Sequence, residues 1–483
     1  MKLLALIEEL RPKRYLHPEI DPEITSLCFD SRSVAPGALF VAIRGTQADG
    51  HRYITQAVKQ GAPAIVCEEL PAITSSQITY IVVENSGEAL GILASTFYGH
   101  PSRALRLVGI TGTNGKTTTA TLLYHLFRAL GYACGLISTI ENFIDNIRKP
   151  THHTTPDALE LNQLLSDMVA KGCAFCFMEV SSHAIDQGRV SGIHFSGAVF
   201  TNLTQDHLDY HHTFAEYLRC KKRLFDLLPS SAFALTNHDD RNGEVMLQNT
   251  IAQKYTYACK SMADFCGRIV EQSIEGMLIR LDGTEVSSPF IGRHNAYNLL
   301  VVYAVARLLG AEKEETLRII STLPSVSGRL EYIKGKNQIT AVVDYSHTPD
   351  ALKNALATLQ EILTPEQALY TVVGCGGNRD KIKRPQMARI AIENSTQAIF
   401  TSDNPRFEDP VDIIGDMLDG LTDQECARCI AIPDRRQAIK TAVLLAPKKS
   451  IILVAGKGHE DYQEINGIKH HFNDREILQE YLT

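Results

Sequence analysis

The sequence lacks the long apolar and basic runs that would point to a membrane or to nucleic acid. No apolar stretch approaches the roughly 18 residues of a membrane helix, and the first apolar run, Leu3–Ile7, ends at Glu8 and Glu9. A secretory signal needs an apolar segment of roughly 7–15 residues, so we expect no signal peptide. No long basic run is present and the net charge is −7, which argues against nucleic acid as the main partner. We expect a cytoplasmic protein without a membrane or nucleic-acid partner.

The cysteines give no sign of a disulfide framework. The eleven cysteines are scattered and odd in number, which suits a reducing compartment. Cys173 and Cys176 form a CxxC pair within CAFCFMEV, a segment typical of a strand. Strand alternation would place their thiols on opposite faces. We therefore interpret them as core thiols rather than as a shared zinc site.

The 483 residues are enough for about three domains of roughly 150 residues each, and three regions differ in pattern. Residues 1–100 contain short β-like runs separated by loops, whereas later residues alternate strand and helix patterns. This alternation indicates parallel sheets covered by helices. No internal repeat or low-complexity segment is present. We predict an α/β fold with domains at 1–100, 101–332 and 333–483. The predicted strands lie at 38–43, 63–68, 78–83, 105–111, 173–180, 197–203, 232–237, 338–345, 368–375, 398–403 and 450–456.

GITGTNGKTTTA (109–120) resembles a phosphate-binding loop with its first glycine displaced. The usual pattern is G-x-x-x-x-G-K-[ST], but Ile110 stands where the first glycine is expected. The context supports a loop: a compact apolar run typical of a buried parallel strand precedes it. Leucines at helical spacing follow it as far as Gly131. The turn therefore leads into a helix N-terminus, where backbone N–H groups and the helix dipole favour phosphate.

Each special residue of this loop has a physical role in phosphate binding. Gly112 and Gly115 allow the backbone to approach the ligand closely. Lys116 can reach the β- and γ-phosphates, and Thr117 can bind Mg²⁺. A second glycine-rich turn, VVGCGGNRD (372–380), fits a dinucleotide site poorly because Arg379 replaces the small residue needed for helix–strand packing.

Two further segments place metal-binding side chains after predicted strands. Glu179 in FMEVSSHAIDQGRV (177–190) lies at a strand's carboxyl end, the edge where ligands bind in α/β sheets. FTNLTQDHLDYHH (200–212) places Asp206 and His207 after another strand. Mg²⁺ prefers oxygen ligands, so a histidine ligand is less usual. From spacing alone, a polar turn that caps a helix is an equal alternative.

Nine motifs in order resemble the Mur ligases, ATP-dependent enzymes that join a carboxylate to an amine. They are TGTNGKTT, EVSSHAIDQGRV, FTNLTQDHLDYH, GRHNAYN, SGRLEYI, DYSHTPDAL, GCGGNRDK, DNPR and GKGHEDY. The resemblance runs from about residue 25 to 470 and is greatest to the members that add the third amino acid of the peptidoglycan precursor. In this family the shortened loop is the ordinary ATP site, so Ile110 does not indicate that the loop has lost its ability to bind a nucleotide.

The resemblance implies a small N-terminal α/β domain for the UDP group, a central P-loop ATPase-like domain with a parallel sheet, and a C-terminal Rossmann-like α/β domain. It implies an acyl-phosphate reaction with ATP, UDP-N-acetylmuramoyl-L-Ala-D-Glu and meso-diaminopimelate as substrates. Two Mg²⁺ ions are the implied cofactors, and we expect a monomer.

By similarity, Glu179 and His207 join Thr117 as metal ligands, and Lys221 is a carbamylated lysine that holds the second metal. Carbamylation requires a neutral amine, and we expect the neighbouring cations Lys222 and Arg223 to lower its pKa. Lys222 leaves a one-residue ambiguity. Lys221 is preferred because it stands fifteen residues after Asp206.

The resemblance also assigns three sets of binding residues. The ATP set is Gly112, Thr113, Asn114, Gly115, Lys116, Thr117, Thr118, Asn295, Asn298, Arg329, Asp344 and His347. The set for the UDP-muramoyl dipeptide is Ser31, Thr46, Gln47, Ala48, Thr154, Thr155, Ser181, Gln187 and Arg189. The diaminopimelate set is Arg379, Asp403, Asn404, Pro405, Arg406, Gly456 and Glu460.

Arg406 carries the prediction of substrate specificity. Its planar guanidinium suits bidentate binding of a carboxylate, and diaminopimelate differs from lysine by one distal carboxylate. DNPR resembles the diaminopimelate-adding members. Glu460 and the backbone at Gly456 are expected to take the distal ammonium. Ser346 departs from the alanine common in the family, and we expect little effect from it.

Three alternatives from other classes remain. They are a lysine-adding or folylpolyglutamate-type ligase, a P-loop kinase or ATPase, and a non-catalytic UDP-sugar-binding protein. DNPR and the region of Ser31 argue against the first, and the set of Lys116, Glu179, His207 and Lys221 argues against the last. Phosphate release that depends on an amine would separate a ligase from the other two classes.

Overall fold

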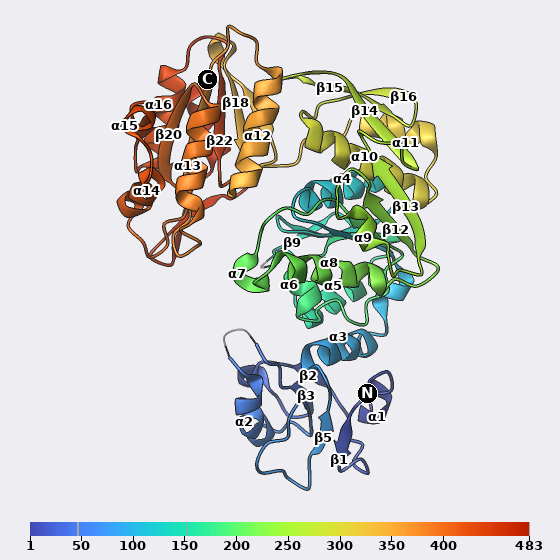
Figure 1. The fold of residues 1–483 in the computed structure, drawn as a ribbon. Helices are drawn as coiled ribbons and strands as arrows, with labels where there is room; N and C mark the ends of the chain where they lie inside the picture. Colours follow the sequence, from blue (N-terminus) through green and yellow to red (C-terminus); the bar gives the residue numbers. More distant parts are fainter. Residues whose placement is uncertain (46–47, 152, 483) are drawn as a thin grey trace. The chain divides into compact units, whose positions relative to one another are not determined.

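The computed structural model describes residues 1–45, 48–151 and 153–482. It divides into two compact units, Met1–Tyr257 (unit 1) and Ala258–Thr483 (unit 2), and each is described by itself. Both units are built around largely parallel sheets with helices on their faces (Figure 1). Within the part of the chain that the structure describes, no helix is long and apolar enough to span a bilayer.

The first sheet of unit 1 has five strands in the order β1-β5-β4-β3-β2, and only β1 runs antiparallel. Helices α1 and α3 pack on one face and α2 on the other. Strands β3 and β4 are buried throughout, as expected for parallel strands covered on both faces. The elements are α1 (Leu3–Leu6), β1 (Arg14–Leu16), β2 (Ser26–Cys28), β3 (Ala38–Val41), α2 (Ile54–Lys59), β4 (Ala64–Cys67), β5 (Thr79–Val82) and α3 (Ser86–Phe97).

The second sheet of unit 1 follows the order β13-β12-β11-β6-β10-β7-β8-β9. The six strands from β13 to β7 are parallel, and β8 and β9 extend the sheet as an antiparallel edge. Its strands are β6 (Arg106–Thr111), β7 (Cys134–Ile137), β8 (Asn142–Ile144), β9 (Ile147–Lys149), β10 (Phe175–Glu179), β11 (Gly197–Phe200), β12 (Phe233–Asn237) and β13 (Gln253–Ala258).

Helix α4 covers one face of this sheet, whereas α5, α6 and α8 pack into the apolar core on the other (Figure 1). β6 lies at the centre of the parallel strands, so the loop that follows it opens at the middle of the sheet's carboxyl edge. The helices are α4 (Lys116–Ala129), α5 (Ala158–Ala170), α6 (Ser182–Asp186), α7 (Leu208–His211), α8 (Phe214–Asp226) and α9 (Gly243–Met246).

The cysteine pair is buried as predicted, but the geometric reason was wrong. β10 begins only at Phe175, so strand alternation does not apply to Cys173. Cys173 and Cys176 pack in the same apolar cluster, and burial raises the pKa of both thiols.

Unit 2 begins with three antiparallel strands that the sequence analysis did not predict. β14 (Phe265–Ser273), β15 (Gly276–Leu281) and β16 (Thr284–Ser288) form two hairpins. Helices α10 (Arg293–Leu308) and α11 (Lys313–Ile320) accompany them. β14 has only one buried residue, Gly267, and the others are half-buried or exposed; it also contains a register shift near Ile269, which explains why it lacks a clear alternating pattern.

The second sheet of unit 2 follows the order β17-β18-β22-β19-β20-β21, with only β17 antiparallel. Helices α12, α13 and α14 cover one face, and α16 and α17 cover the other (Figure 1). The strands are β17 (Glu331–Lys334), β18 (Thr340–Asp344), β19 (Leu369–Cys375), β20 (Gln397–Ser402), β21 (Cys429–Ala431), β22 (Ile451–Ala455), β23 (Tyr462–Ile465) and β24 (Ile468–His471), the last two forming a separate hairpin. The helices are α12 (Pro349–Ile362), α13 (Lys383–Asn394), α14 (Pro410–Leu418), α15 (Asp423–Cys426), α16 (Arg435–Leu445) and α17 (Asp474–Leu482).

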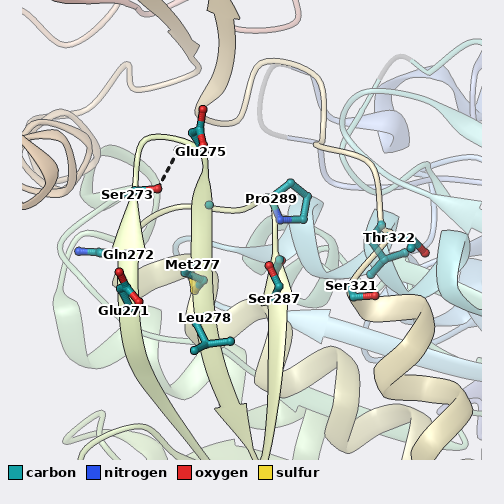
Figure 2. A pocket seen from close by; sticks show the side chains of 13 residues that line it. Glu271, Gln272, Ser273, Glu275, Met277, Leu278, Ser287, Pro289, Ser321 and Thr322 are labelled. Carbon is teal, nitrogen blue, oxygen red and sulfur yellow. Dashed lines mark hydrogen bonds between the residues drawn. The ribbon is translucent and has the colours of Figure 1, made fainter.

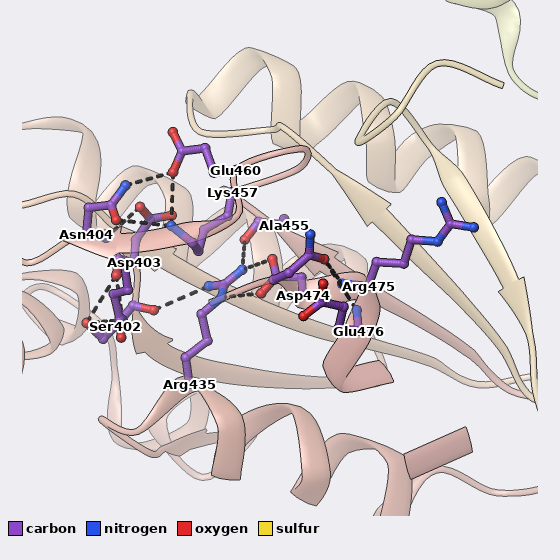
Figure 3. Close-up of polar contacts among 12 residues, drawn as sticks. Ser402, Asp403, Asn404, Arg435, Ala455, Lys457, Glu460, Asp474, Arg475 and Glu476 are labelled. Carbon is purple, nitrogen blue, oxygen red and sulfur yellow. Dashed lines mark hydrogen bonds and ion pairs between the residues drawn. The ribbon is translucent and has the colours of Figure 1, made fainter. Parts of the chain in front are cut away.

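A buried ion pair ties two strand ends of this sheet to its helices (Figure 3). The Arg435 guanidinium donates to both carboxylate oxygens of Asp474, at 2.8 and 2.7 Å, and both side chains are fully buried. The same guanidinium donates to the carbonyl of Ala455 at 3.0 Å and to that of Ser402 at 3.3 Å. One side chain therefore fixes the carboxyl ends of β20 and β22.

We predict that Arg435→Met lowers the free energy of unfolding of unit 2 by about 3–5 kcal/mol, because it leaves the Asp474 carboxylate buried and unpaired. The control is Arg436→Met, whose ion pair with Glu480 is exposed and contributes about 0–1 kcal/mol. Urea unfolding followed by circular dichroism measures both. Equal losses in the two variants would contradict the prediction.

Candidate active site

The predicted phosphate loop connects β6, which ends at Thr111, to α4, which begins at Lys116. Gly112 and Gly115 have positive φ angles of 149° and 88°, which favour glycine. Ile110 is a buried residue of β6 rather than part of the turn. The turn therefore begins at Gly112, and the isoleucine does not disturb it.

The segment after β11 leaves no room for a side chain at the start of the loop. A Cβ atom on Gly112 would lie 1.9 Å from the Thr201 hydroxyl oxygen. That hydroxyl donates to the carbonyl of Asn114 at 2.7 Å, and the Asn202 side-chain oxygen accepts from the Asn114 amide at 3.0 Å. The amide of Thr113 donates to the carbonyl of Asn202 at 2.8 Å. The segment after β11 therefore shapes the loop, a contact that the sequence analysis did not foresee.

Two other residues of the ATP set begin the helix that follows. Thr117 and Thr118 are buried in the first turn of α4. The Lys116 ammonium folds back and donates to the carbonyls of Gly112 and Thr113 at 2.9 and 2.8 Å. The cation that was predicted to bind phosphate thus lies against its own loop.

Glu179 ends β10, the strand beside β6, and its side chain is fully buried. Its carboxylate accepts a hydrogen bond from the Thr139 amide at 2.7 Å and lies 3.2 Å from the Thr139 hydroxyl. The Thr154 hydroxyl lies 3.1 Å from that same hydroxyl. The prediction that Glu179 stands at the ligand edge of the sheet is confirmed in position.

The residues predicted to bind the muramoyl dipeptide in this part of the chain form one connected cluster. The Thr155 hydroxyl donates to the carbonyl of Glu179 at 2.8 Å and lies 3.3 Å from the Ser181 hydroxyl. Arg189 donates to the carbonyl of Thr155 at 2.8 Å and through two nitrogens to the Gln187 side chain at 3.0 and 2.6 Å. The Ser181 side chain also caps the N-terminus of α6, so it stabilises this helix as well. Burial lowers the pKa of Arg189.

His207 lies between polar and aromatic neighbours after β11. It adopts a φ of 53°, and its Nε2 atom is 3.5 Å from a carboxylate oxygen of Asp206. Its ring centre is 5.0 Å from that of His183 and 6.1 Å from that of Tyr217. These contacts place His207 beside the helix α8 that carries Lys221.

Lys221 is almost completely buried and reaches the phosphate loop. Its ammonium nitrogen donates to the carbonyl of Gly112 at 3.0 Å and lies 4.6 Å from the centre of the Tyr217 ring. The pKa of Lys221 lies well below its usual value, chiefly because burial penalises the charged form and secondly because of the Lys116 charge. Burial and the Lys116 charge therefore favour the neutral form of this amine beside the phosphate loop.

The lowered pKa of Lys221 agrees in direction with the prediction from sequence, but its cause is different. Lys222 forms an ion pair with Asp226, and Arg223 donates to Glu88 at 2.7 Å. Their charges are thus partly balanced elsewhere, and neither cation is among the causes of the Lys221 shift. Burial decides the pKa, and burial was not evident from a segment that looked like a basic helix face.

The ATP residues predicted in unit 2 occupy two places. Asn295 and Asn298 are buried one turn apart on α10, and Asn298 donates to the Asn295 side chain at 3.1 Å. Asp344 ends β18 and accepts from the Leu330 amide at 2.8 Å and from the Ser346 hydroxyl. The serine that departs from the family pattern thus contacts a predicted ATP residue.

The other predicted residues of unit 2, Arg329 and His347, lie around the ring of Tyr345, which was not predicted from the sequence. The Arg329 guanidinium lies 4.9 Å from the centre of its ring, and the His347 ring lies 4.6 Å away. The ring of His459 lies 4.9 Å from it on another loop. Burial raises the pKa of Tyr345, so this side chain stays neutral and serves as a packing surface.

The predicted diaminopimelate residues occupy loops that follow β19, β20 and β22. A Cβ atom on Gly377 would lie 1.9 Å from the carbonyl oxygen of Pro405, so the first two loops meet backbone to backbone. The Arg406 guanidinium donates to the carbonyl of Gly377 at 2.8 Å and lies 3.4 Å from Glu464. Arg379 is exposed on the adjoining turn.

Asp403 and Gly456 connect the third loop to the second. A Cβ atom on Gly456 would lie 2.5 Å from a carboxylate oxygen of Asp403, whose other oxygen accepts from the Asn404 amide at 2.6 Å. Asn404 donates to Glu460 at 2.8 Å. Asp403, Asn404, Gly456 and Glu460 are therefore brought together as predicted.

A buried ion-pair network around Arg384, which was not predicted from the sequence, packs against these loops. Arg384 is completely buried and donates to Glu408 at 2.8 and 3.1 Å and to Asp416 at 2.7 Å. These contacts lower the pKa of Glu408 to about 2. A buried arginine inside a helical pattern has no local sequence signal.

Ser31 and Ala48, two of the residues predicted for the UDP group, lie before and after β3 of the first sheet of unit 1 in the sequence. Ser31 is buried in a short helical turn, and the carbonyl of Ala48 accepts from the Gly45 amide at 3.0 Å. Thr46 and Gln47 lie outside the described residues.

Two of the predicted metal ligands, Thr117 and Glu179, offer oxygen atoms at one edge of the sheet. Among the described residues, no three His, Cys, Asp or Glu side chains gather as a metal cage. Mg²⁺ typically keeps waters and binds one or two carboxylates together with substrate phosphates. The Thr117 hydroxyl on the phosphate loop and the Glu179 carboxylate on the adjacent strand provide such ligands.

A separate pocket of about 420 Å³ lies at the tip of the β14–β16 hairpins (Figure 2). Gln272, Glu275 and Thr322 are among the residues that line it. None of the predicted site residues that the structure describes belongs to its lining. The pocket is therefore not part of the candidate active site.

Comparison with known proteins identifies relatives along nearly the whole chain. Family models match at residues 23–98 (Mur ligase family, catalytic domain), 110–306 (Mur ligase middle domain) and 328–458 (Mur ligase, glutamate ligase domain). A Parabacteroides distasonis protein named UDP-N-acetylmuramoyl-L-alanyl-D-glutamate–2,6-diaminopimelate ligase is 57% identical over 461 residues, 95% of each chain. A Phocaeicola vulgatus protein of the same name is 53% identical over 480 residues, 99% of each chain. A solved structure of a ligase so named has a TM-score of 0.71 at 32% identity, covering 100% of this chain and 98% of that one.

We predict that Gly112→Ala weakens the binding of Mg-ADP by about 10- to 100-fold, because overpacking at this contact costs about 1–3 kcal/mol. The matched control is Gly131→Ala, which also has a positive φ but has no atom within 4 Å of the added Cβ. Isothermal titration calorimetry measures both affinities. A loss of the same size in the control would show that backbone strain alone is responsible.

Proposed function

Because the chain belongs to the Mur ligase family, we propose that it uses ATP to join meso-2,6-diaminopimelate to UDP-N-acetylmuramoyl-L-alanyl-D-glutamate. The observation that carries the proposal is the contact of the buried Lys221 amine with a phosphate loop. A simple hydrolase has no evident need for such a lysine. The names of the relatives supply the substrates.

The reaction that we propose has two steps. A carboxylate oxygen of the D-glutamate attacks the γ-phosphorus of ATP, and the bond from phosphorus to ADP breaks. The amine of diaminopimelate then attacks the carbonyl carbon of the acyl phosphate, loses a proton and expels phosphate. The first step brings two anions together, so nearby cations and N–H donors must offset their repulsion. Lys116 and the backbone of the loop supply these groups.

We assign Mg²⁺ to Thr117, Glu179, His207 and the carbamate of Lys221. The neutral amine of Lys221 can attack CO₂ and lose a proton, which converts a buried base into an anionic metal ligand. When bound, Mg²⁺ neutralises charge that develops on the transferred phosphoryl group. Lys221 is a better candidate than Lys222, whose ammonium is paired with Asp226.

We assign recognition of the amino acid to the loops after β19, β20 and β22. Arg406 and Arg379 would bind the distal carboxylate that lysine lacks, and Glu460 with the backbone of Gly456 would bind the distal ammonium. Arg406 is oriented by the Gly377 carbonyl and by Glu464. An oriented guanidinium loses less conformational freedom when it binds a carboxylate.

We assign the remaining predicted residues as follows. Asn295, Asn298, Arg329, Asp344 and His347 would contact the adenine and ribose of ATP. The cluster around Thr155 and Arg189 would hold the muramoyl dipeptide, and the region of Ser31 would hold the UDP group. The three predicted domains, 1–100, 101–332 and 333–483, would act as a monomer in the cytoplasm, where ATP is available.

The test of the function is phosphate release from ATP in the presence of Mg²⁺ and UDP-N-acetylmuramoyl-L-Ala-D-Glu. Parallel reactions contain meso-diaminopimelate, L-lysine or no amine. We expect release only with diaminopimelate. Release with lysine would retain the ligase and overturn its specificity, whereas release without any amine would indicate a kinase or an ATPase.

We predict that Lys221→Met lowers kcat by at least about 100-fold, comparable to the loss of one transition-state-stabilising group. Lys222→Met, its neighbour on α8, should retain activity within about threefold, because an ion pair of this kind contributes only about 0.3–0.5 kcal/mol. Steady-state phosphate release measures both. A larger loss of activity in Lys222→Met than in Lys221→Met would show that the metal-binding role belongs to Lys222 and not to Lys221.

We predict that Arg406→Ala raises the KM for diaminopimelate by about 10- to 100-fold, since a hydrogen bond to a charged group contributes about 1.5–3 kcal/mol. The KM for ATP should stay within about twofold of the wild-type value. Initial rates at varied concentrations of each substrate measure both constants. Equal increases in the two constants would refute the assignment of Arg406 to the amino acid.

A further inference from the structure

Lys457 is a completely buried lysine between the loops that follow β20 and β22. Its ammonium donates to the side-chain oxygen of Asn404 at 3.0 Å and to a carboxylate oxygen of Glu460, Oε2, at 2.9 Å. It also lies 5.3 Å from the centre of the Tyr462 ring. A buried ammonium is unfavourable unless it is paired and hydrogen-bonded, and these contacts provide both.

Asn404 closes a triangle with Lys457 and Glu460 (Figure 3). Its side-chain nitrogen donates to the same Oε2 atom of Glu460 at 2.8 Å, while its oxygen also accepts from the Glu464 amide at 2.9 Å. Two donors therefore hold one oxygen of Glu460. The other oxygen, Oε1, points away from both donors in Figure 3, and within the described chain it has no hydrogen bond.

We propose that Lys457 is a positioning residue of the amino-acid site, which fixes the Glu460 carboxylate so that Oε1 is presented to the distal ammonium of the incoming amino acid. This inference rests on the proposed function, in which Glu460 binds that ammonium. A carboxylate has about four acceptor positions, so Oε1 remains available while Oε2 is occupied. A carboxylate that is already oriented loses less freedom when the ligand binds.

The strand ends that carry Asn404 and Lys457 are held in place by a buried arginine. Lys457 and Asn404 follow the ends of β22 and β20, and Arg435 fixes the carbonyls of Ala455 and Ser402 at those ends. Asn404 thus cannot move away from Lys457 without disturbing a buried ion pair. This arrangement favours a permanent contact between Lys457 and its two partners, Asn404 and Glu460.

The proposed role makes a prediction that separates Lys457 from Arg406. The distal ammonium is common to diaminopimelate and lysine, whereas the distal carboxylate belongs to diaminopimelate alone. Loss of Lys457 should therefore weaken the binding of both amino acids by the same factor and leave the ratio of their dissociation constants unchanged. Loss of Arg406 should weaken the binding of diaminopimelate more than that of lysine.

The experiment measures initial rates of the full chain carrying Lys457→Met, with saturating ATP and UDP-muramoyl dipeptide. We expect the KM for diaminopimelate to rise at least about tenfold, the lower end of the losses that follow removal of a supporting contact at metal sites. The KM for ATP should stay within twofold. The control is Lys334→Met, whose ion pair with Glu275 is exposed, and all its constants should be unchanged. An unchanged KM for diaminopimelate, or an equal rise in the KM for ATP, would overturn the proposal.

A double-mutant cycle with Glu460→Gln tests whether Lys457 acts through Glu460. If it does, the KM of the double variant for diaminopimelate is no higher than that of the more affected single variant. A KM raised by the product of the two single effects would overturn the proposal. If Lys457→Met does not fold, Lys457→Gln replaces it, because its amide still donates to Glu460 but carries no charge. A wild-type chain that releases no phosphate with diaminopimelate would refute the proposed function itself, which the variants alone would not show.

Discussion

Close packing around glycines at the carboxyl ends of parallel strands is the constraint on which the predicted site residues of each unit depend. In unit 1, Gly112 lies so near Thr201 that no side chain fits, and this contact shapes the phosphate loop. In unit 2, Gly377 meets Pro405 in the same way, and the contact orients Arg406. Ligands bind at this edge of α/β sheets because the loops there are held by rigid strands. The chemistry proposed for each unit thus depends on glycines at which a side chain would not fit.

Burial has opposite consequences for the two lysines that matter most to this account. Lys221 is buried beside another cation, Lys116, so its neutral form is favoured. Lys457 is buried just as deeply, but it is paired with the carboxylate of Glu460. The first lysine is suited to react with CO₂ and the second to hold a carboxylate in place. The same residue type therefore takes a chemical role or a supporting role according to the charge beside it.

The sequence predicts the parallel strands and the phosphate loop well because their signals are local: continuous apolar runs and glycines between strand and helix. It does not predict β14, whose apolar residues are interrupted by polar ones and are mostly half-buried. It also does not reveal why the pKa of Lys221 is lowered, because Lys221 is buried by tertiary contacts between α8 and the phosphate loop. Arg384 was missed for the same reason, since its partner Glu408 is distant in sequence. Thr46 and Gln47 remain predictions.

The central claim is that the phosphate loop activates a carboxylate as an acyl phosphate. The most direct test uses UDP-N-acetylmuramoyl-L-Ala-D-Glu labelled with ¹⁸O in the reacting carboxylate, together with ATP and meso-diaminopimelate. Mass spectrometry of the released phosphate then follows the label. The account predicts one ¹⁸O atom in each phosphate, because the carboxylate oxygen bound to phosphorus leaves with it. Unlabelled phosphate would show that water or another group had attacked ATP, and it would contradict the account.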